Sequence, residues 1–191
     1  MSIFEFVLAL TSVISGLAIA HLLTGVVGLL RNAKRVRFSL VHALWIWSAF
    51  ATTIGNWAAD WELRSLNDWP AWTLLLLIAS KIAQYVFCAF VTPEVPAEGE
   101  IDLRAFHERE RTGYLSAVVG FCAIALIFNI SFGGAFYYAQ WLRDSAITII
   151  ALAATLTALF IRARWVQLAA ALVFAGLAGY FLLAVSHLGT H

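Results

Sequence analysis

Charged residues are scarce in this chain. Asp, Glu, Lys and Arg make up 12% of its 191 residues, whereas apolar residues make up 62%. Soluble domains carry about 25% charged and about 45–50% apolar residues. Because so few polar side chains cannot cover such an apolar interior in water, lipid has to solvate much of the surface. The composition argues against a soluble domain and against a nucleic-acid partner, and it predicts that the lipid bilayer is the main partner.

Cysteine and catalytic motifs are also sparse. Cys88 and Cys122 are the only cysteines, and both lie inside apolar segments without metal-ligand spacing. We therefore expect buried free thiols. The chain has no G-x-S-x-G motif and no P-loop, and Arg111 occupies the second histidine position of an H-E-x-x-H pattern that begins at His107. No catalytic residue and no metal site is predicted, so an enzyme is not the expected class.

Six apolar segments are long enough to cross a hydrocarbon core of about 30 Å at roughly 1.5 Å per residue. A capping box formed by Ser2 and Glu5 predicts where the first segment begins. The sequence thus predicts an all-α fold in which residues 1–191 form one bundle of six transmembrane helices. The predicted spans are about 3–30, 38–59, 72–91, 114–138, 145–161 and 165–186.

Basic residues alternate along the chain. Nine of the twelve Lys and Arg residues lie in three stretches between spans, at 31–37, 104–111 and 162–164. The two intervening connections carry one base each, Arg64 and Arg143. Because basic loops favour the cytoplasmic side, we expect a multi-pass protein of the cell (cytoplasmic or inner) membrane with both termini outside.

The longest predicted cytoplasmic loop covers residues 93–112. Its first half is acidic and extended, with Pro93 and Pro96. Its second half, Asp102 to Arg111, predicts a charged helix at the membrane interface, anchored by Leu103 and Phe106.

Small residues recur at every fourth position of the first span. Such a stripe allows close approach of another helix, either within the bundle or in a homo-oligomer. A shorter stripe at Ala171, Ala175 and Gly179 would allow the sixth span to pack against the first. The stripe of the first span consists of Ser12, Gly16, Ala20, Thr24 and Gly28.

Lys81 is the exception among the bases, because it lies near the middle of the third span. An ionisable group at this depth costs about 2.5–3.5 kcal/mol and is expected to face the protein interior. Helical spacing predicts that Gln84, Tyr85 and Cys88 share its face. No carboxylate is expected at this depth, so we expect deprotonation, oxygens such as that of Tyr85 or of backbone carbonyls, or a bound anion or water to neutralise it.

His21 lies at a similar depth on the first span. A satisfied interior histidine and a proton-carrying group both fit this position. No cofactor is predicted. Haem ligation by His21 and His42 is an alternative, but His42 is expected several ångströms closer to the cytoplasmic interface than His21. Asn129, in the fourth span, is expected to hydrogen-bond across helices.

Three functions fit these features. The preferred one is a small channel or transporter for an anion or a proton-coupled solute. The second is a non-catalytic scaffold or accessory subunit that acts through helix association. The third is a redox or lipid-processing membrane enzyme. The candidate pathway residues are His21, Lys81, Gln84, Tyr85 and Asn129.

Overall fold

A computed structural model describes residues 2–65, 69–96, 98–133 and 138–186, and it is almost entirely helical. The described helices are α1 (Ile3–Arg31), α2 (Leu40–Ala59), α3 (Ala71–Val91), α4 (Leu103–Gly133), α5 (Tyr138–Phe160) and α6 (Arg164–Ser186). Short 3-10 turns cover Ala33–Arg35 and Asp60–Ser65. The all-α prediction is confirmed.

Four helices are long and apolar enough to cross a membrane. They cover Ile3–Arg31, Ala71–Val91, Leu103–Ser131 and Arg164–Val185. The apolar part of α5, Ser145–Phe160, is shorter. Membrane association therefore agrees with the fold, while six spans and an orientation with both termini outside stay predictions.

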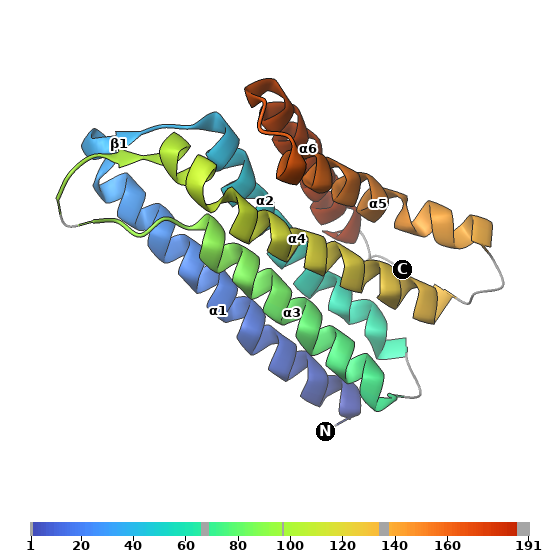
Figure 1. Ribbon diagram of the computed structural model, residues 1–191. Coiled ribbons are helices and arrows are strands. Elements are labelled where there is room, and N and C mark those ends of the chain that lie inside the picture. The colour runs from blue at the N-terminus through green and yellow to red at the C-terminus, as the bar shows by residue number, and fades with distance from the viewer. Residues whose placement is uncertain (1, 66–68, 97, 134–137, 187–191) are drawn as a thin grey trace.

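The helices form two layers. The contacts place α1, α3, α4 and α5 in a row, and Figure 1 shows α1, α3 and α4 side by side. The second layer consists of α2 and α6, which share the most extensive helix contact. Between the layers, Trp45 of α2 is fully buried against Tyr114 and Phe174, with ring centroids 5.8 and 5.2 Å away.

Local signals explain most helix ends. The capping box is confirmed, since Ser2 and Glu5 exchange both hydrogen bonds. α3 ends just before Thr92-Pro93, where proline cannot continue the helix. α4 begins at Leu103 because the Asp102 carboxylate accepts hydrogen bonds from the amides of Arg104 and Ala105.

Two helices extend beyond the predicted segments. The charged helix predicted at the interface is the first part of α4, so residues 103–112 belong to a helix that continues into the apolar segment. α5 begins at Tyr138, before the predicted fifth span, while its apolar part starts at Ser145, where the span was predicted to start. Residues 134–137 at the predicted end of the fourth span lie outside the described part of the chain.

The connections that carry the basic stretches meet at one end of the bundle, here called the basic end. There β1 (Val36–Arg37) and β2 (Ile101–Asp102) pair in parallel, with Val36 opposite Ile101. Arg35 donates to the carbonyls of Pro96 and Gly99 at 3.0 and 2.8 Å. The acidic half of the 93–112 loop is therefore tied to the connection between α1 and α2.

The opposite end is here called the tryptophan end, because Trp57, Trp61 and Trp72 lie there on the connection between α2 and α3 and on the adjoining helix turns. All three side chains are exposed. The Trp57 indole donates to the Ser12 hydroxyl at 2.9 Å, which ties α2 to α1 near this end.

The small-residue stripes do not pack on each other. The α6 stripe faces α2, where Gly179 approaches the Trp47 ring, and α6 makes its main contacts with α2 and α5. On α1, the buried face consists of Val7, Thr11, Ser15, Ala18 and Leu22. The predicted contact between α1 and α6 is therefore wrong.

Candidate functional site

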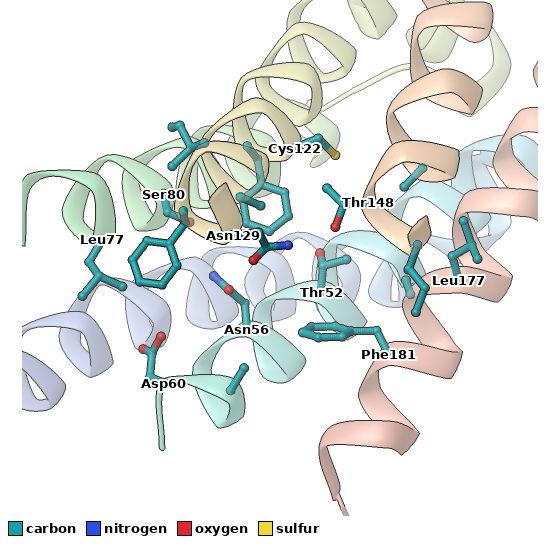
Figure 2. A pocket seen from close by; sticks show the side chains of 18 of the residues that line it. Thr52, Asn56, Asp60, Leu77, Ser80, Cys122, Asn129, Thr148, Leu177 and Phe181 are labelled. Carbon is teal, nitrogen blue, oxygen red and sulfur yellow. The ribbon is translucent and has the colours of Figure 1, made fainter. Parts of the chain in front are cut away.

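A cavity of about 410 Å³ lies inside the bundle between α2, α3, α4, α5 and α6. Its wall is largely apolar, with a few polar side chains: Thr52, Asn56, Asp60, Ser80, Asn129 and Thr148. Figure 2 shows Asn56, Thr52 and Asn129 around it, with Asp60 toward one edge. A concave, mainly apolar space with a few converging polar groups is the usual form of a small-molecule site.

Asp60 of this cavity forms a buried ion pair with Lys81. The Lys81 ammonium lies 2.8 Å from one carboxylate oxygen of Asp60 and 3.0 Å from the other. It also donates to the Asn56 carbonyl at 3.1 Å. The Lys81 side chain is 1% exposed and that of Asp60 is 8% exposed, so protein surrounds both charges.

The prediction that no carboxylate lies near Lys81 was wrong. Depth was counted from backbone positions, but the four-carbon lysine stem carries its charge several ångströms along the helix axis. The stem reaches toward the tryptophan end, where α2 finishes and Asp60 follows as its C-terminal cap. As expected, a backbone carbonyl, that of Asn56, accepts a hydrogen bond from Lys81. The Tyr85 hydroxyl, the other expected acceptor, does not.

Gln84 lies one helical turn from Lys81 and is buried with it. Its amide donates to the hydroxyls of Thr52 and Thr53 at 3.2 and 3.0 Å. The Thr53 hydroxyl in turn lies 3.3 Å from the Cys88 sulfur. This network cross-links α2 and α3 beside the cavity and includes Cys88, which is a buried free thiol as predicted.

Two asparagine amides lie at the cavity. Asn129 of α4 donates to the Ser145 hydroxyl of α5 at 3.1 Å, which agrees with a hydrogen bond across helices. The side-chain nitrogen of Asn56 is buried and has no acceptor among the described residues. Because a buried amide without a partner is costly, the cavity offers a donor position for a bound water or solute.

His21 and Tyr85 lie away from the cavity. Both side chains are on the exposed side of α1 and α3, where their rings meet edge to face at a centroid distance of 6.4 Å. The structure therefore brings Lys81, Gln84 and Asn129 to the region of the cavity but not His21 and Tyr85.

The two histidines considered for haem have different surroundings. His42 of α2 is fully buried with its ring 5.2 Å from that of Phe106, whereas His21 is exposed. Haem ligation by these two residues stays an alternative and not the prediction, which is that no cofactor is bound. Within the described ranges, no group of three or more His, Cys, Asp or Glu side chains is arranged to hold a metal ion.

The depth argument placed Asp60 near the outer surface, so its ion pair with Lys81 was not predicted, although one signal in the sequence pointed to a site there. Asn56 and Asp60 are four residues apart and therefore share a helical face with each other. The contribution of α4, α5 and α6 to the wall follows only from tertiary packing.

Comparisons with protein-family models, with curated proteins and with solved structures give no match. The class that the fold supports is a helical protein with several apolar helices that are compatible with a membrane. Any more specific function has to rest on the site itself.

Proposed function

We propose that the protein is a six-span membrane transporter that moves a small solute together with a proton. In this proposal the basic end faces the cytoplasm and both termini lie outside, as the alternation of basic loops favours. One observation carries the proposal: a cavity of about 410 Å³ inside the bundle adjoins the buried Lys81–Asp60 ion pair.

The ion pair supplies a site for the proton. Ionisable residues inside membrane helices are costly and usually mark a pathway or a relay. Protonation of Asp60 would remove the carboxylate that holds the Lys81 ammonium at 2.8 Å. Lys81 would then need a new partner or lose its own proton, so a single protonation changes the contacts between α2 and α3. This coupling is what a proton-driven transporter requires.

The cavity wall favours an uncharged, partly apolar solute. The positive charge of Lys81 is neutralised by Asp60, which removes the main argument for an anion as the substrate. Hydroxyl and amide groups at Thr52, Asn56 and Asn129 offer hydrogen bonds between apolar surfaces. Of the two expected substrates, an anion and a proton-coupled solute, we therefore propose the proton-coupled solute.

Proteoliposomes loaded with the pH indicator pyranine test this proposal. A panel of neutral and zwitterionic solutes is added outside with an inward proton gradient, and solute-induced acidification inside is recorded. We expect at least one solute to accelerate acidification with the natural protein. The double variant Asp60→Asn, Lys81→Met removes both charges and should abolish the effect.

Arg64→Gln is the matched control, because it removes a charge at the same end of the bundle. Arg64 is exposed and donates to the Trp61 carbonyl. This variant should retain the solute-induced signal. Equal acidification with the natural protein and the double variant, for every solute, would contradict the proposal.

A second candidate is a scaffold that assembles through α1, and one observation favours it. The middle of the small-residue stripe is exposed, and no atom lies within 4 Å of a Cβ placed on Gly16. If a second copy packs there, Gly16→Leu should reduce the oligomer size in detergent, whereas Leu17→Ala on the neighbouring exposed position should not. An unchanged size for Gly16→Leu would exclude this interface.

A further inference from the structure

A second cavity, here called the basic cavity, lies at the basic end and has a volume of about 490 Å³. The first three turns of α4 line it with Arg104, His107, Glu108 and Arg111. The break between α5 and α6 and the first turn of α6 contribute Arg162 and Arg164. Four arginines against one glutamate leave an excess of positive charge in one concave space.

Arg111 is the central observation. Although only 6% of its surface is exposed, its guanidinium lines the basic cavity. One of its nitrogens donates to the Ala158 carbonyl at 2.6 Å. A guanidinium has five N–H donors, and among the described residues Ala158 is the only acceptor found for them. The remaining donors can serve a ligand in the cavity.

The positive charges have few internal partners. Glu108 pairs with Arg104 at 3.3 Å. In the described part of the chain, Arg111, Arg162 and Arg164 form no ion pair with a carboxylate. A buried cation without a counter-ion is strongly unfavourable, so an anion from outside the chain is the group that this arrangement lacks.

The wall behind the arginines is rigidly held. The Nε2 atom of His107 lies 3.2 Å from the side-chain oxygen of Gln167, and the Nδ1 atom is hydrogen-bonded to the Tyr114 hydroxyl. The Gln167 amide donates to the carbonyls of Ala158 and Ile161 at the end of α5. Because these bonds connect α4, α5 and α6, the helix ends that carry the arginines are held together before any ligand arrives.

The surroundings of the basic cavity are apolar and exposed. Phe38 and Leu40 flank the lining residue Ser39, Phe160 and Ile161 precede Arg162, and all four side chains are exposed. Trp165, which follows Arg164, is 76% exposed. Aromatic side chains next to basic ones are typical of a membrane interface. A headgroup in the cavity would leave its acyl chains beside these residues.

From this arrangement we infer that the basic cavity binds a phosphate group, with the phosphate oxygens accepting hydrogen bonds from Arg111, Arg162 and Arg164. Arginine is suited to this role because its planar fork matches the geometry of phosphate. The phosphate can belong to an anionic lipid of the membrane or to a soluble phosphate. The inference does not rest on the proposed transport function, since no residue of the other cavity takes part.

The test measures melting temperature as a function of added ligand for the purified full-length protein in a neutral detergent. One arm titrates dioleoylphosphatidylglycerol against dioleoylphosphatidylcholine, which has the same acyl chains and no net charge. The other arm titrates inorganic phosphate and glycerol 3-phosphate without lipid. The pocket variant is Arg162→Gln, Arg164→Gln, because both side chains are exposed and their removal leaves the buried wall intact.

The matched control is Arg31→Gln, Lys34→Gln, which removes two exposed bases at the same end but outside the basic cavity. Since each base near an anionic surface contributes about five-fold in affinity, the pocket variant should bind phosphatidylglycerol roughly 30-fold more weakly. The control should lose much less. Arg111→Lys, which keeps the charge but not the fork, should also weaken binding.

The outcomes separate the two sources. Selective loss of the phosphatidylglycerol response in the pocket variant identifies a lipid headgroup. Selective loss of a response to inorganic phosphate or glycerol 3-phosphate, without a phosphatidylglycerol response, identifies a soluble phosphate. Equal responses of the pocket variant and the control to every ligand, or no response of the natural protein, would overturn the inference.

Discussion

The two cavities of this bundle treat charge in opposite ways. In the cavity toward the tryptophan end, the buried Lys81 ammonium meets the Asp60 carboxylate at 2.8 Å, so the charge is neutralised within the chain. In the basic cavity, Arg111 is also buried, but its described partner is a neutral carbonyl. The comparison teaches that buried charge alone does not define a site. What matters is whether the chain supplies the counter-charge or leaves it to a ligand.

Removing one partner of the ion pair should have the largest effect. Lys81→Met or Asp60→Asn alone leaves one buried group without its counter-charge, and we expect a loss of about 3–5 kcal/mol in the free energy of unfolding. The double variant Asp60→Asn, Lys81→Met leaves no charge and should lie close to the natural protein. Denaturant unfolding in detergent micelles measures all three.

Comparison of the two single variants with the double variant tests whether Asp60 neutralises the charge of Lys81 within the chain. If the double variant is as unstable as the less stable single variant, Lys81 and Asp60 do not compensate each other, and the contrast between the two cavities fails.

The wall of the basic cavity should be the next most sensitive region. Gln167→Leu removes the donor to the Ala158 and Ile161 carbonyls and leaves His107 without its amide partner. We expect the free energy of unfolding to fall by about 2 kcal/mol. Thr157→Val is the control, because its exposed hydroxyl bonds only to the Ala153 carbonyl of its own helix, and it should change stability by less than about 0.5 kcal/mol.

If Gln167→Leu behaves like Thr157→Val, the hydrogen-bonded wall does not hold α4, α5 and α6 together. The arginines of the basic cavity would then not be positioned in advance.

The interface between α2 and α6 closes one side of the first cavity and should tolerate added volume poorly. A Cβ on Gly55 would lie 2.8 Å from the Phe181 ring, so the ring must move, and Phe181 also lines the cavity. We expect Gly55→Ala to cost roughly 1–2 kcal/mol, at the low end for overpacking because the ring can tilt. Thermal unfolding in detergent measures this difference.

Gly16→Ala is the matched control on α1, where no atom lies within 4 Å of the added Cβ. Alanine should stabilise this exposed helix position by up to about 1 kcal/mol. Equal effects of the two substitutions would mean that α2 and α6 do not pack as closely as described.

The smallest effect should come from the start of α4, next to the basic cavity. Hydrogen bonds from the amides of Ala105 and Arg104, together with Arg37 and Arg104, lower the pKa of Asp102 from its usual value. A lowered carboxylate pKa stabilises the fold at a pH above the unfolded value of about 3.9, and this stabilisation is lost as the pH falls through the folded pKa.

Hydrogen exchange of residues 103–106 should therefore speed up at acid pH in the natural protein. In Asp102→Asn, which keeps the capping geometry without a titrating group, exchange protection should not depend on pH in this range. Identical pH dependence in both proteins would contradict the assignment of Asp102 as the cap.

The sequence predicted the helices better than the sites. The ends of α1, α2, α3 and α6 lie within two residues of the predicted spans, because apolar length and local stops such as Thr92-Pro93 determine them. A helix was predicted from Asp102, but its continuity with the fourth span was missed, because the apolar segment begins only at Tyr114.

The two cavities depend on contacts that no local pattern encodes. Lys81 and its face partner Gln84 were predicted to be inside, but the pairing with Asp60 depends on the direction of the lysine stem and on where α2 ends. The arginines of the basic cavity belong to two separate basic stretches of the sequence, and only the packing of α4 beside α5 and α6 brings them together.

The most direct test of the central claim is the accessibility of the cavity beside the ion pair. In a variant with both native cysteines replaced by alanine, Ser80→Cys places a thiol on the cavity wall, while Ser48→Cys places one at a fully buried position outside it. Labelling of sealed, right-side-out vesicles by a small, water-soluble methanethiosulfonate is followed by mass spectrometry. The account predicts labelling at position 80 and none at position 48; equal labelling at both positions, or none at position 80, would contradict it.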